Sequence, residues 1–271
     1  MRTGKIESMS IESGLGVLPG SEEGVSVAPG WVLRSVESVA STNDAVADWP
    51  VWTALRAVRQ TGGRGRHQRK WVSNEGGLWV SAVVPMGAPE RGWAAMPLVA
   101  GLAVCETLLG LGVGPLRLRW PNDVMSGDRK LAGLLVDCFR AGRAVVGMGL
   151  NVRNLPEQED TSLAGATIRL ADLLETVPDV TELAVRWLGG LRGVMEEMTA
   201  KGFVSLADRL NRWWETGQEV EIEIDSQRWT GFFEGVDDEG RLRVRTLDGV
   251  QRTLAGHQVT RLREFHGGMS L

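Results

Sequence analysis

Residues 180–198 read VTELAVRWLGGLRGVMEEM, and the apolar side chains in this stretch recur every three or four residues. That spacing places them on one side of an α-helix, so the stretch predicts an amphipathic helix whose apolar stripe packs into a core. Asp179 follows a proline and directly precedes the periodic residues, which is the usual position of a helix-capping side chain. This helix anchors the interpretation of the segments on either side.

Short apolar runs typical of β-strands precede the helix, and a second helical stretch at 96–111 lies among them. Strands interspersed with helices in this way indicate a mixed α and β domain. The predicted strands are residues 31–36, 54–58, 78–84, 116–120, 131–139 and 144–152. Together with a further helical stretch through residue 212, they predict one domain over residues 31–214.

Beyond this domain the apolar side chains alternate with charged ones, which is the period of a β-strand. Residues 219–224 alternate apolar with acidic side chains, and residues 241–245 alternate apolar with arginine side chains, on either side of a turn-prone segment at 237–240. The pattern predicts a small antiparallel barrel over residues 215–271. Because about 50 residues form a marginal domain alone, we expect it to pack on the first domain.

The composition indicates a folded chain. Of the 271 residues, 43% are apolar and 24% are charged, and the net charge is −4. No uncharged apolar run reaches the roughly 18 residues of a membrane-spanning helix. Residues 1–30 lack the basic and apolar segments of a signal peptide and have no lasting periodicity, so they predict a flexible leader. We therefore expect a cytoplasmic protein that binds no membrane. Its mild acidity disfavours nucleic-acid binding by the whole surface, whereas a local basic site stays open.

The cysteines and histidines indicate no metal site. Cys105 and Cys138 lie in apolar stretches and are expected to be small core residues rather than a disulfide or a zinc site. The three histidines have no spacing that suits a metal.

The densest group of candidate binding residues is the segment QTGGRGRHQRKW at 60–71, between two predicted strands. Its glycines bring backbone N–H groups close to a ligand, and its four cationic side chains suit a phosphate or a carboxylate. The segment is typical of a loop that closes over an anion. A solvated basic turn and an arginine-glycine nucleic-acid segment are the alternatives. The cationic residues are Arg64, Arg66, Arg69 and Lys70.

A second candidate is RWPNDV at 119–124, followed by KLAGLL at 130–135. Pro121 cannot continue a strand ladder, so the chain is expected to turn there and to present Asn122 and Asp123 at a strand end. Lys130 opens a strongly apolar strand. It is interpreted either as a surface lysine whose stem lies on apolar neighbours or as a charge held near a dry pocket.

Two further motifs carry little information singly. They are GMGLNV at 147–152, whose glycines permit tight strand packing, and STN at 41–43, where Ser41 or Thr42 can cap a short helix. Several familiar sites are excluded, because the chain has no Gly-x-Gly-x-x-Gly, no P-loop, no Gly-x-Ser-x-Gly and no His-Glu-x-x-His.

In their order along the chain, these four motifs resemble those of the biotin protein ligases, also called biotin–acetyl-CoA-carboxylase ligases. The motifs are STN, the Gly-Arg-Gly-Arg loop with its following tryptophan, Trp-Pro-Asn-Asp with Lys-Leu-Ala-Gly, and Gly-x-Gly-x-Asn-Val. The resemblance covers residues 31–263. It implies an α+β fold: a mixed-sheet catalytic domain of the class II aminoacyl-tRNA synthetase/biotin ligase type with a small C-terminal SH3-like β-barrel. It also implies an enzyme that forms biotinyl-5′-AMP from biotin and ATP with Mg²⁺ and then transfers biotin to a lysine of a biotin carboxyl carrier protein.

The resemblance also implies roles for individual residues. Small polar side chains would hydrogen-bond the ureido head of biotin, the arginine loop would order over biotin and the phosphates, and one glycine would let biotin approach the strand. The residues concerned are Ser41, Thr42, Asn43 and Gln60 at the head, Arg64, Gly65 and Arg66 in the loop, and Gly133 in the strand.

For the reaction itself, the resemblance implies that Lys130 bridges the biotin carboxylate and the α-phosphate as the catalytic cation. Arg64, Arg66 and Lys130 would contact ATP, and Asn122 would help to bind the nucleotide or magnesium. Asp123 would orient or deprotonate the carrier lysine. The family often has lysine where this chain has Arg119, and we assign Arg119 no role.

Two expectations qualify this interpretation, and two alternatives remain beside it. Thirty leader residues are too few for the winged helix-turn-helix domain of ligases that also act as repressors, so we expect no DNA binding. The resemblance allows a homodimer without requiring one. A lipoate or octanoate ligase or transferase is the alternative enzyme, and a nucleic-acid-binding adaptor without catalysis is the alternative of another class.

Overall fold

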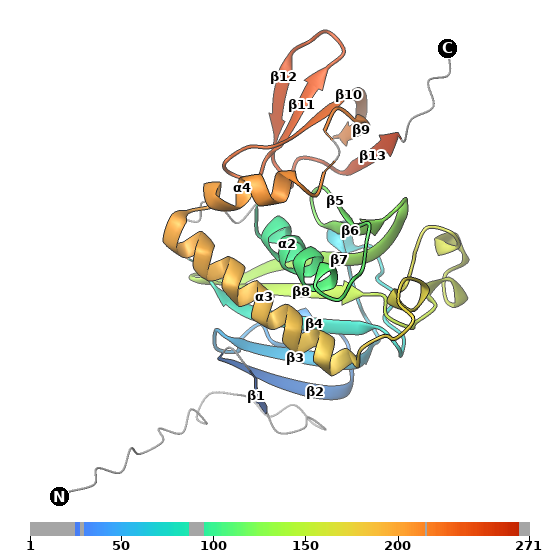
Figure 1. The fold of residues 1–271 in the computed structure, drawn as a ribbon, viewed down its shortest axis with the longest axis vertical. Helices are drawn as coiled ribbons and strands as arrows, with labels where there is room; N and C mark the ends of the chain where they lie inside the picture. Colours follow the sequence, from blue (N-terminus) through green and yellow to red (C-terminus); the bar gives the residue numbers. More distant parts are fainter. Residues whose placement is uncertain (1–24, 28–29, 87–94, 215, 266–271) are drawn as a thin grey trace, which may run out of the picture.

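An eight-stranded mixed sheet runs through the larger part of the protein in the computed structural model, which describes residues 25–27, 30–86, 95–214 and 216–265 (Figure 1). The strand order is β1-β2-β3-β4-β8-β7-β6-β5. Among the strands in the described ranges, only β2 and β3 pair in parallel, and their crossover carries the short helix α1 (Thr42–Ala45). The strands are β1 (Val25–Val27), β2 (Trp31–Val39), β3 (Thr53–Gln60), β4 (Leu78–Pro85), β5 (Arg117–Arg119), β6 (Asp123–Ser126), β7 (Arg129–Arg140) and β8 (Arg143–Leu150).

Two long helices cover one face of this sheet, as Figure 1 shows: α2 (Met96–Leu109) and α3 (Val180–Lys201). They pack on each other and bury their apolar side chains against the strands. Asp179 caps α3 as predicted, because its side chain accepts a hydrogen bond from the backbone N–H of Thr181 at 2.7 Å. The helix predicted from the apolar spacing at 180–198 is therefore confirmed.

Side chains alternate between the two faces of the sheet, and each face has its own buried cluster. Val146 belongs to the large core under α2 and α3. Val145 points to the opposite face, into a small core that includes Val46 and Trp49. These two residues come just after α1 in the chain. Strand β8 continues on this second face with Gly147, so the sheet surface next to α1 carries no side chain there. A ligand can approach the strands on this face.

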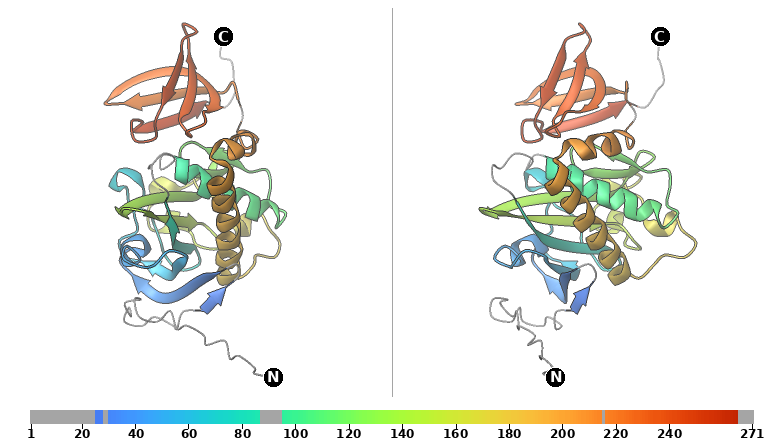
Figure 2. Two further views of the ribbon diagram at one scale, coloured as in Figure 1. Left: turned by 90° about the vertical axis from the view of Figure 1, so that its left-hand side faces the viewer. Right: turned by 60° about the vertical axis from the view of Figure 1, so that its left-hand side comes forward.

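The C-terminal part of the protein is a five-stranded antiparallel sheet that lies on one end of the first part, with α4 (Val204–Asn211) between them (Figure 2). Its inward side chains belong to the same buried cluster as those of the first part, and the Nε1 atom of Trp120 donates to the carbonyl oxygen of Gly240 at 3.3 Å. The expected packing of the two parts is thus confirmed. Neighbouring strands in this sheet follow the order β12-β11-β10-β9-β13. Along the chain they are β9 (Glu219–Ile224), β10 (Gln227–Val236), β11 (Leu242–Thr246), β12 (Gln251–Leu254) and β13 (Arg261–Phe265).

In the eight-stranded sheet, two short strands, β1 and β6, escaped the sequence analysis. Val25–Val27 form β1, antiparallel to β2, so the prediction of a flexible leader over 1–30 is wrong for these residues. Most of that predicted leader lies outside the described residues. Asp123–Ser126 form β6, where the sequence predicted only turns, because Pro121 masks how soon the ladder resumes.

The two cysteines differ from each other. Cys105 is buried, as predicted, whereas Cys138 is exposed, and the two form no disulfide. The prediction of a core position for Cys138 is wrong because the pairing of β7 with β8 becomes irregular between Asp137 and Arg140, where the strand leaves the core.

Short 3-10 helices complete the described structure: η1 (Arg66–Gln68), η3 (Pro156–Gln158), η4 (Thr161–Leu163) and η5 (Leu170–Asp172). Across the described ranges, none of the helices has the length and apolar character needed to cross a membrane.

Candidate functional site

A cavity of about 690 Å³ lies on the sheet face next to α1 and brings the sequence-predicted site residues together. One end is formed by α1 and β3, the middle by β7 and β8, and the other end by the segment around β6 and by residues 259–265 of the C-terminal part. The predicted residues that line it are Ser41, Thr42, Asn43, Gln60, Arg64, Gly65, Arg66, Asn122, Asp123, Lys130 and Gly133.

The α1 end of the cavity is polar and buried. Ser41 caps α1, with its Oγ accepting from the backbone N–H of Asp44 at 3.4 Å. The backbone N–H of Thr42 donates to Oε1 of Gln60 at 2.8 Å, and Nε2 of Gln60 donates to Oγ of Ser73 at 2.9 Å. Ser41 therefore caps a short helix, as predicted, and all three STN residues line the cavity, while their role toward biotin stays a prediction.

Asn43 is held by two residues that the sequence analysis missed. Its Nδ2 donates to Oδ2 of Asp137 at 2.8 Å, and its Oδ1 lies 2.6 Å from the hydroxyl of Ser81. A Cβ on Gly147 would come within 2.2 Å of Asn43 Oδ1, which explains the glycine. Ser81 and Asp137 each interrupt an apolar strand, and that polar interruption is the signal by which the sequence shows them.

The arginine loop is anchored to the protein by its two central guanidinium groups. Arg64 forms a two-pronged ion pair with Asp44, and its Nη2 also lies 3.2 Å from Asp137. Nη2 of Arg66 donates to the carbonyl oxygens of Gly256 at 2.7 Å and Val259 at 3.0 Å, in the C-terminal part. The loop thus spans the cavity from α1 to the second sheet.

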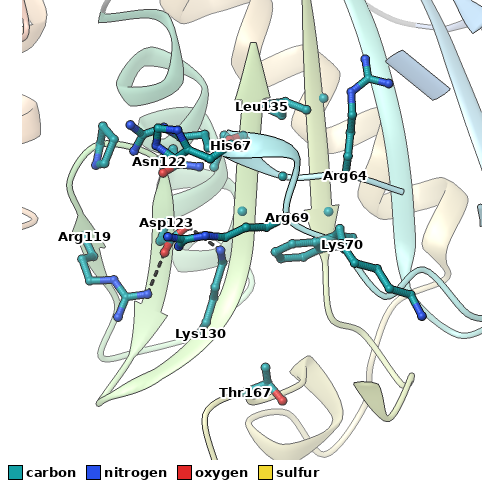
Figure 3. Close-up of a pocket in the computed structure, with 18 of the residues that line it drawn as sticks. Arg64, His67, Arg69, Lys70, Arg119, Asn122, Asp123, Lys130, Leu135 and Thr167 are labelled. Atoms are coloured by element: carbon teal, nitrogen blue, oxygen red, sulfur yellow. Dashed lines mark hydrogen bonds and ion pairs between the residues drawn. The ribbon is translucent and has the colours of Figure 1, made fainter. Parts of the chain in front are cut away.

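The surroundings of the two arginines shift the pKa of each in opposite directions. Hydrogen bonding to Asp44 raises the pKa of Arg64 above its ordinary value, whereas burial lowers the pKa of Arg66. In Figure 3, Arg69 extends toward Asp123 and Lys70 points away from it.

The far end of the cavity holds a group of three charges centred on Asp123 (Figure 3). The Nζ of Lys130 lies 2.6 Å from Oδ1, and Nη2 of Arg119 donates to Oδ2 at 2.7 Å. Burial acts to raise the pKa of Asp123, but the charges and hydrogen bonds of its two partners outweigh it and hold the pKa below the usual value. Arg119, to which the sequence analysis assigned no role, therefore belongs to this group.

Trp71 lines the same cavity and is a further residue to which the sequence analysis assigned no role. Lys130 Nζ lies 4.7 Å from the centroid of its ring, a cation–π contact. A Cβ on Gly133 would lie 2.8 Å from the indole, and one on Gly149 would lie 2.5 Å from its Nε1. Gly133 thus makes room for Trp71 and Lys130, and its predicted role of letting biotin approach the strand stays a prediction.

The C-terminal sheet supplies part of the cavity wall. Nη1 of Arg117 donates to Oε2 of Glu264 in β13 at 2.5 Å, and the side chains are only 12% and 11% exposed. Such a buried pair fixes β13 against β5.

Comparison with known proteins identifies this arrangement. Residues 32–151 match the biotin/lipoate A/B protein ligase family, and residues 216–256 match the biotin protein ligase C-terminal domain. The chain is 32% identical over 233 residues to the biotin–[acetyl-CoA-carboxylase] ligase of Mycobacterium tuberculosis, which spans 80% of this chain and 85% of the relative. The chain belongs to the biotin protein ligase family.

Other members support the same assignment for this ligase. It is 30% identical over 254 residues to the bifunctional ligase/repressor BirA of Escherichia coli, covering 89% of this chain and 75% of that protein. Its fold is similar to the biotin protein ligase of Aquifex aeolicus in complex with biotin and ATP. The TM-score is 0.76, the identity is 29%, and the match covers 86% of this chain and 99% of that one.

The predicted family and enzyme class are thereby confirmed, as is the α+β fold with a mixed sheet and a second antiparallel sheet. The adaptor hypothesis leaves unexplained a family match that runs through the STN, arginine-loop, Trp-Pro-Asn-Asp and Gly-x-Gly motifs.

Proposed function

We propose that this ligase joins biotin to ATP as biotinyl-5′-AMP and then transfers the biotinyl group to a lysine of a biotin carboxyl carrier protein. One observation carries the proposal: a single cavity has a neutral polar end at Thr42, Asn43 and Gln60 and a cationic end at Lys130. Biotin has the matching polarity, with a ureido ring at one end and a carboxylate at the other. The ring would lie against α1 and the carboxylate near Lys130.

Lys130 is the residue that best serves the first step. A carboxylate oxygen of biotin attacks the α-phosphorus of ATP, and pyrophosphate leaves. Because both reactants are anions, a cation between them lowers the energy of the transition state. Lys130 lies beside Asp123, and Arg119 remains on that carboxylate when Lys130 turns to a new anion. The lysine can therefore move without leaving Asp123 unpaired.

The arginine loop would close the site over the adenylate. A mixed anhydride hydrolyses in water, so the cavity must exclude solvent until the carrier arrives. Arg66, which donates to two carbonyl groups of the C-terminal part, holds the loop across the cavity mouth. Arg64 supports the base of the loop through Asp44 and Asp137, and its charge is available to phosphate oxygens only if these ion pairs loosen.

Asp123 would orient the incoming lysine of the carrier. A carboxylate whose pKa lies below the usual value is a weak base, so the orienting role is favoured over the deprotonating one. The carrier lysine, as its neutral amine after losing a proton to solvent, then attacks the biotinyl carbonyl carbon; AMP leaves, the nitrogen releases a second proton to solvent, and the amide bond forms.

Magnesium would enter with ATP. Within the ranges that the structure describes, no three His, Cys, Asp or Glu side chains are grouped to hold a metal. Magnesium needs only one or two protein oxygens when phosphate oxygens and water complete its coordination, so this donor set fits. Nδ2 of Asn122 donates to the carbonyl oxygen of Leu134 at 2.8 Å, and Oδ1 of the same amide is the atom suited to nucleotide or metal.

Exchange of labelled pyrophosphate into ATP tests the proposal. We expect exchange to require biotin and to be unaffected by lipoate, and a streptavidin blot to detect biotin on the carrier protein after complete turnover. Exchange that requires lipoate and ignores biotin would contradict the proposed substrate.

A further inference from the structure

The α1 end of the cavity contains a continuous chain of hydrogen-bonded side chains that starts at Asp137. Nδ2 of Asn43 donates to Oδ2 of Asp137 at 2.8 Å and lies 3.5 Å from the carbonyl oxygen of Leu135. Oδ1 of Asn43 lies 2.6 Å from the Ser81 hydroxyl, which lies 2.7 Å from the Thr42 hydroxyl. Ser81 is fully buried, and Thr42 and Asn43 are each 4% exposed.

Asp137 determines which way the amide of Asn43 faces. An ionised carboxylate accepts hydrogen bonds and cannot donate them. The amide must therefore turn its NH₂ group toward Asp137 and its oxygen toward Ser81. The same Asp137 oxygen lies 3.2 Å from Nη2 of Arg64, so the arginine loop holds the carboxylate in this position.

The orientation of Asn43 then fixes the hydroxyl hydrogens. Ser81 has one hydrogen, and because it faces an oxygen of Asn43, that hydrogen goes to Asn43. The Thr42 hydroxyl lies 2.7 Å from that of Ser81 and 3.0 Å from Oε1 of Gln60, so its single hydrogen is engaged by one of these two oxygens. The backbone N–H of Thr42 is also engaged, by Oε1 of Gln60 at 2.8 Å. Thr42 and Asn43 thus have oxygen lone pairs, rather than hydrogens, left for a ligand.

We infer that Asp137 is a positioning residue that makes the α1 end of the site an acceptor of hydrogen bonds, acting through Asn43, Ser81 and Thr42. The inference rests on the proposed function. A ureido ring carries N–H donors that match these acceptors, whereas the dithiolane ring of lipoate and the alkyl end of octanoate carry none. Buried acceptors without a donor are costly, so Asp137 and Ser81 determine the preference for biotin.

The test uses the pyrophosphate exchange reaction of the full chain with the variant Asp137→Asn. Asparagine has the same shape but can offer NH₂ to Asn43, so the amide of Asn43 loses its fixed orientation. We expect the KM for biotin to rise about tenfold, which corresponds to about 1.4 kcal/mol. The kcat and the KM for ATP should stay within about twofold, since the reacting atoms lie at the other end of the cavity. Ser81→Ala, a smaller change, should give the same pattern.

Asp48→Asn is the matched control. Asp48 forms an exposed ion pair with Arg140, which lies at the end of strand β7, and the loss of this pair should leave all three constants unchanged. A KM for biotin within twofold of wild type in both Asp137→Asn and Ser81→Ala would overturn the inference. So would equal changes in the constants for biotin and ATP, which indicate general damage. A wild-type reaction that ignores biotin would instead refute the proposed function, and the inference with it.

Discussion

The ammonium nitrogen of Lys130 lies 2.6 Å from Oδ1 of Asp123, so the cation proposed for the reaction is paired with a carboxylate of the protein. A carboxylate ligand must compete with Asp123 for this charge. The competition is eased by Arg119, which stays bound to Oδ2 at 2.7 Å. The pair therefore holds Lys130 at the cavity without neutralising the end where two anions must meet.

Replacing Lys130 tests its role as the catalytic cation. We expect Lys130→Ala to lower biotin-dependent pyrophosphate exchange by about 10³-fold or more, because the charge between the two anions is lost. The melting temperature should fall only modestly, since Arg119 remains paired with Asp123 when the charge of Lys130 is removed. Lys201→Ala, at an exposed position at the end of α3, is the control and should leave exchange unaltered. Near-normal exchange in Lys130→Ala would exclude the role.

Replacing Arg66 tests the closure of the loop. Arg66→Ala removes both hydrogen bonds to the C-terminal part, so the reactive adenylate should escape and label lysines of bystander proteins about tenfold more than wild type. Streptavidin blots of a mixture of carrier and serum albumin measure the ratio. Arg186→Ala on the surface of α3 serves as the control. Labelling confined to the carrier in Arg66→Ala would contradict the closing role.

Adding one methyl group at Gly147 tests whether the missing side chain at this position makes room for Asn43. The new Cβ would come within 2.2 Å of Asn43 Oδ1, so Gly147→Ala should displace Asn43 and raise the KM for biotin by about tenfold or more. Gly193→Ala is the matched change, because nothing lies within 4 Å of the added atom on the exposed side of α3. That control should keep the wild-type KM and raise stability by about 0.5–1 kcal/mol. Equal KM values in the two variants would rule out the steric explanation.

The pKa of Asp123 predicts how stability depends on pH. Its pKa in the folded protein lies below the ordinary aspartate value of 3.8, so the ionised group stabilises the fold fully above about pH 4. This contribution is lost as the pH falls through the lower folded pKa. Urea unfolding between pH 2 and pH 6 should show Asp123→Asn less stable than wild type at pH 6, with the difference shrinking toward pH 2. A difference that grows on acidification would show that the sign is wrong.

The regular elements of the fold were predictable because their signals are local. The three- and four-residue spacing at 180–198 marked α3, and the alternation at 219–224 marked β9. The strand β1 has three residues, too few for a period to show, and β6 follows a proline closely. Cys138 lies at a strand end whose exposure depends on the pairing of β7 with β8, which the sequence does not display.

The candidate site was predictable only where its residues form motifs. The predicted residues all line one cavity, yet the partners that orient them were missed. Asn43 and Asp137 are 94 positions apart and meet only because β7 lies near α1 in the folded sheet. Trp71 likewise contacts Lys130, and its indole fills the space next to Gly133 and Gly149. The two glycines in the sequence do not show which side chain fills that space.

The two carbonyl groups that receive Arg66 belong to residues 190 and 193 positions further along the chain. In the proposed cycle the product leaves only after these two bonds break, so the Arg66 guanidinium must detach from residues 256 and 259 once per turnover, while the shared core keeps the two parts of the protein together.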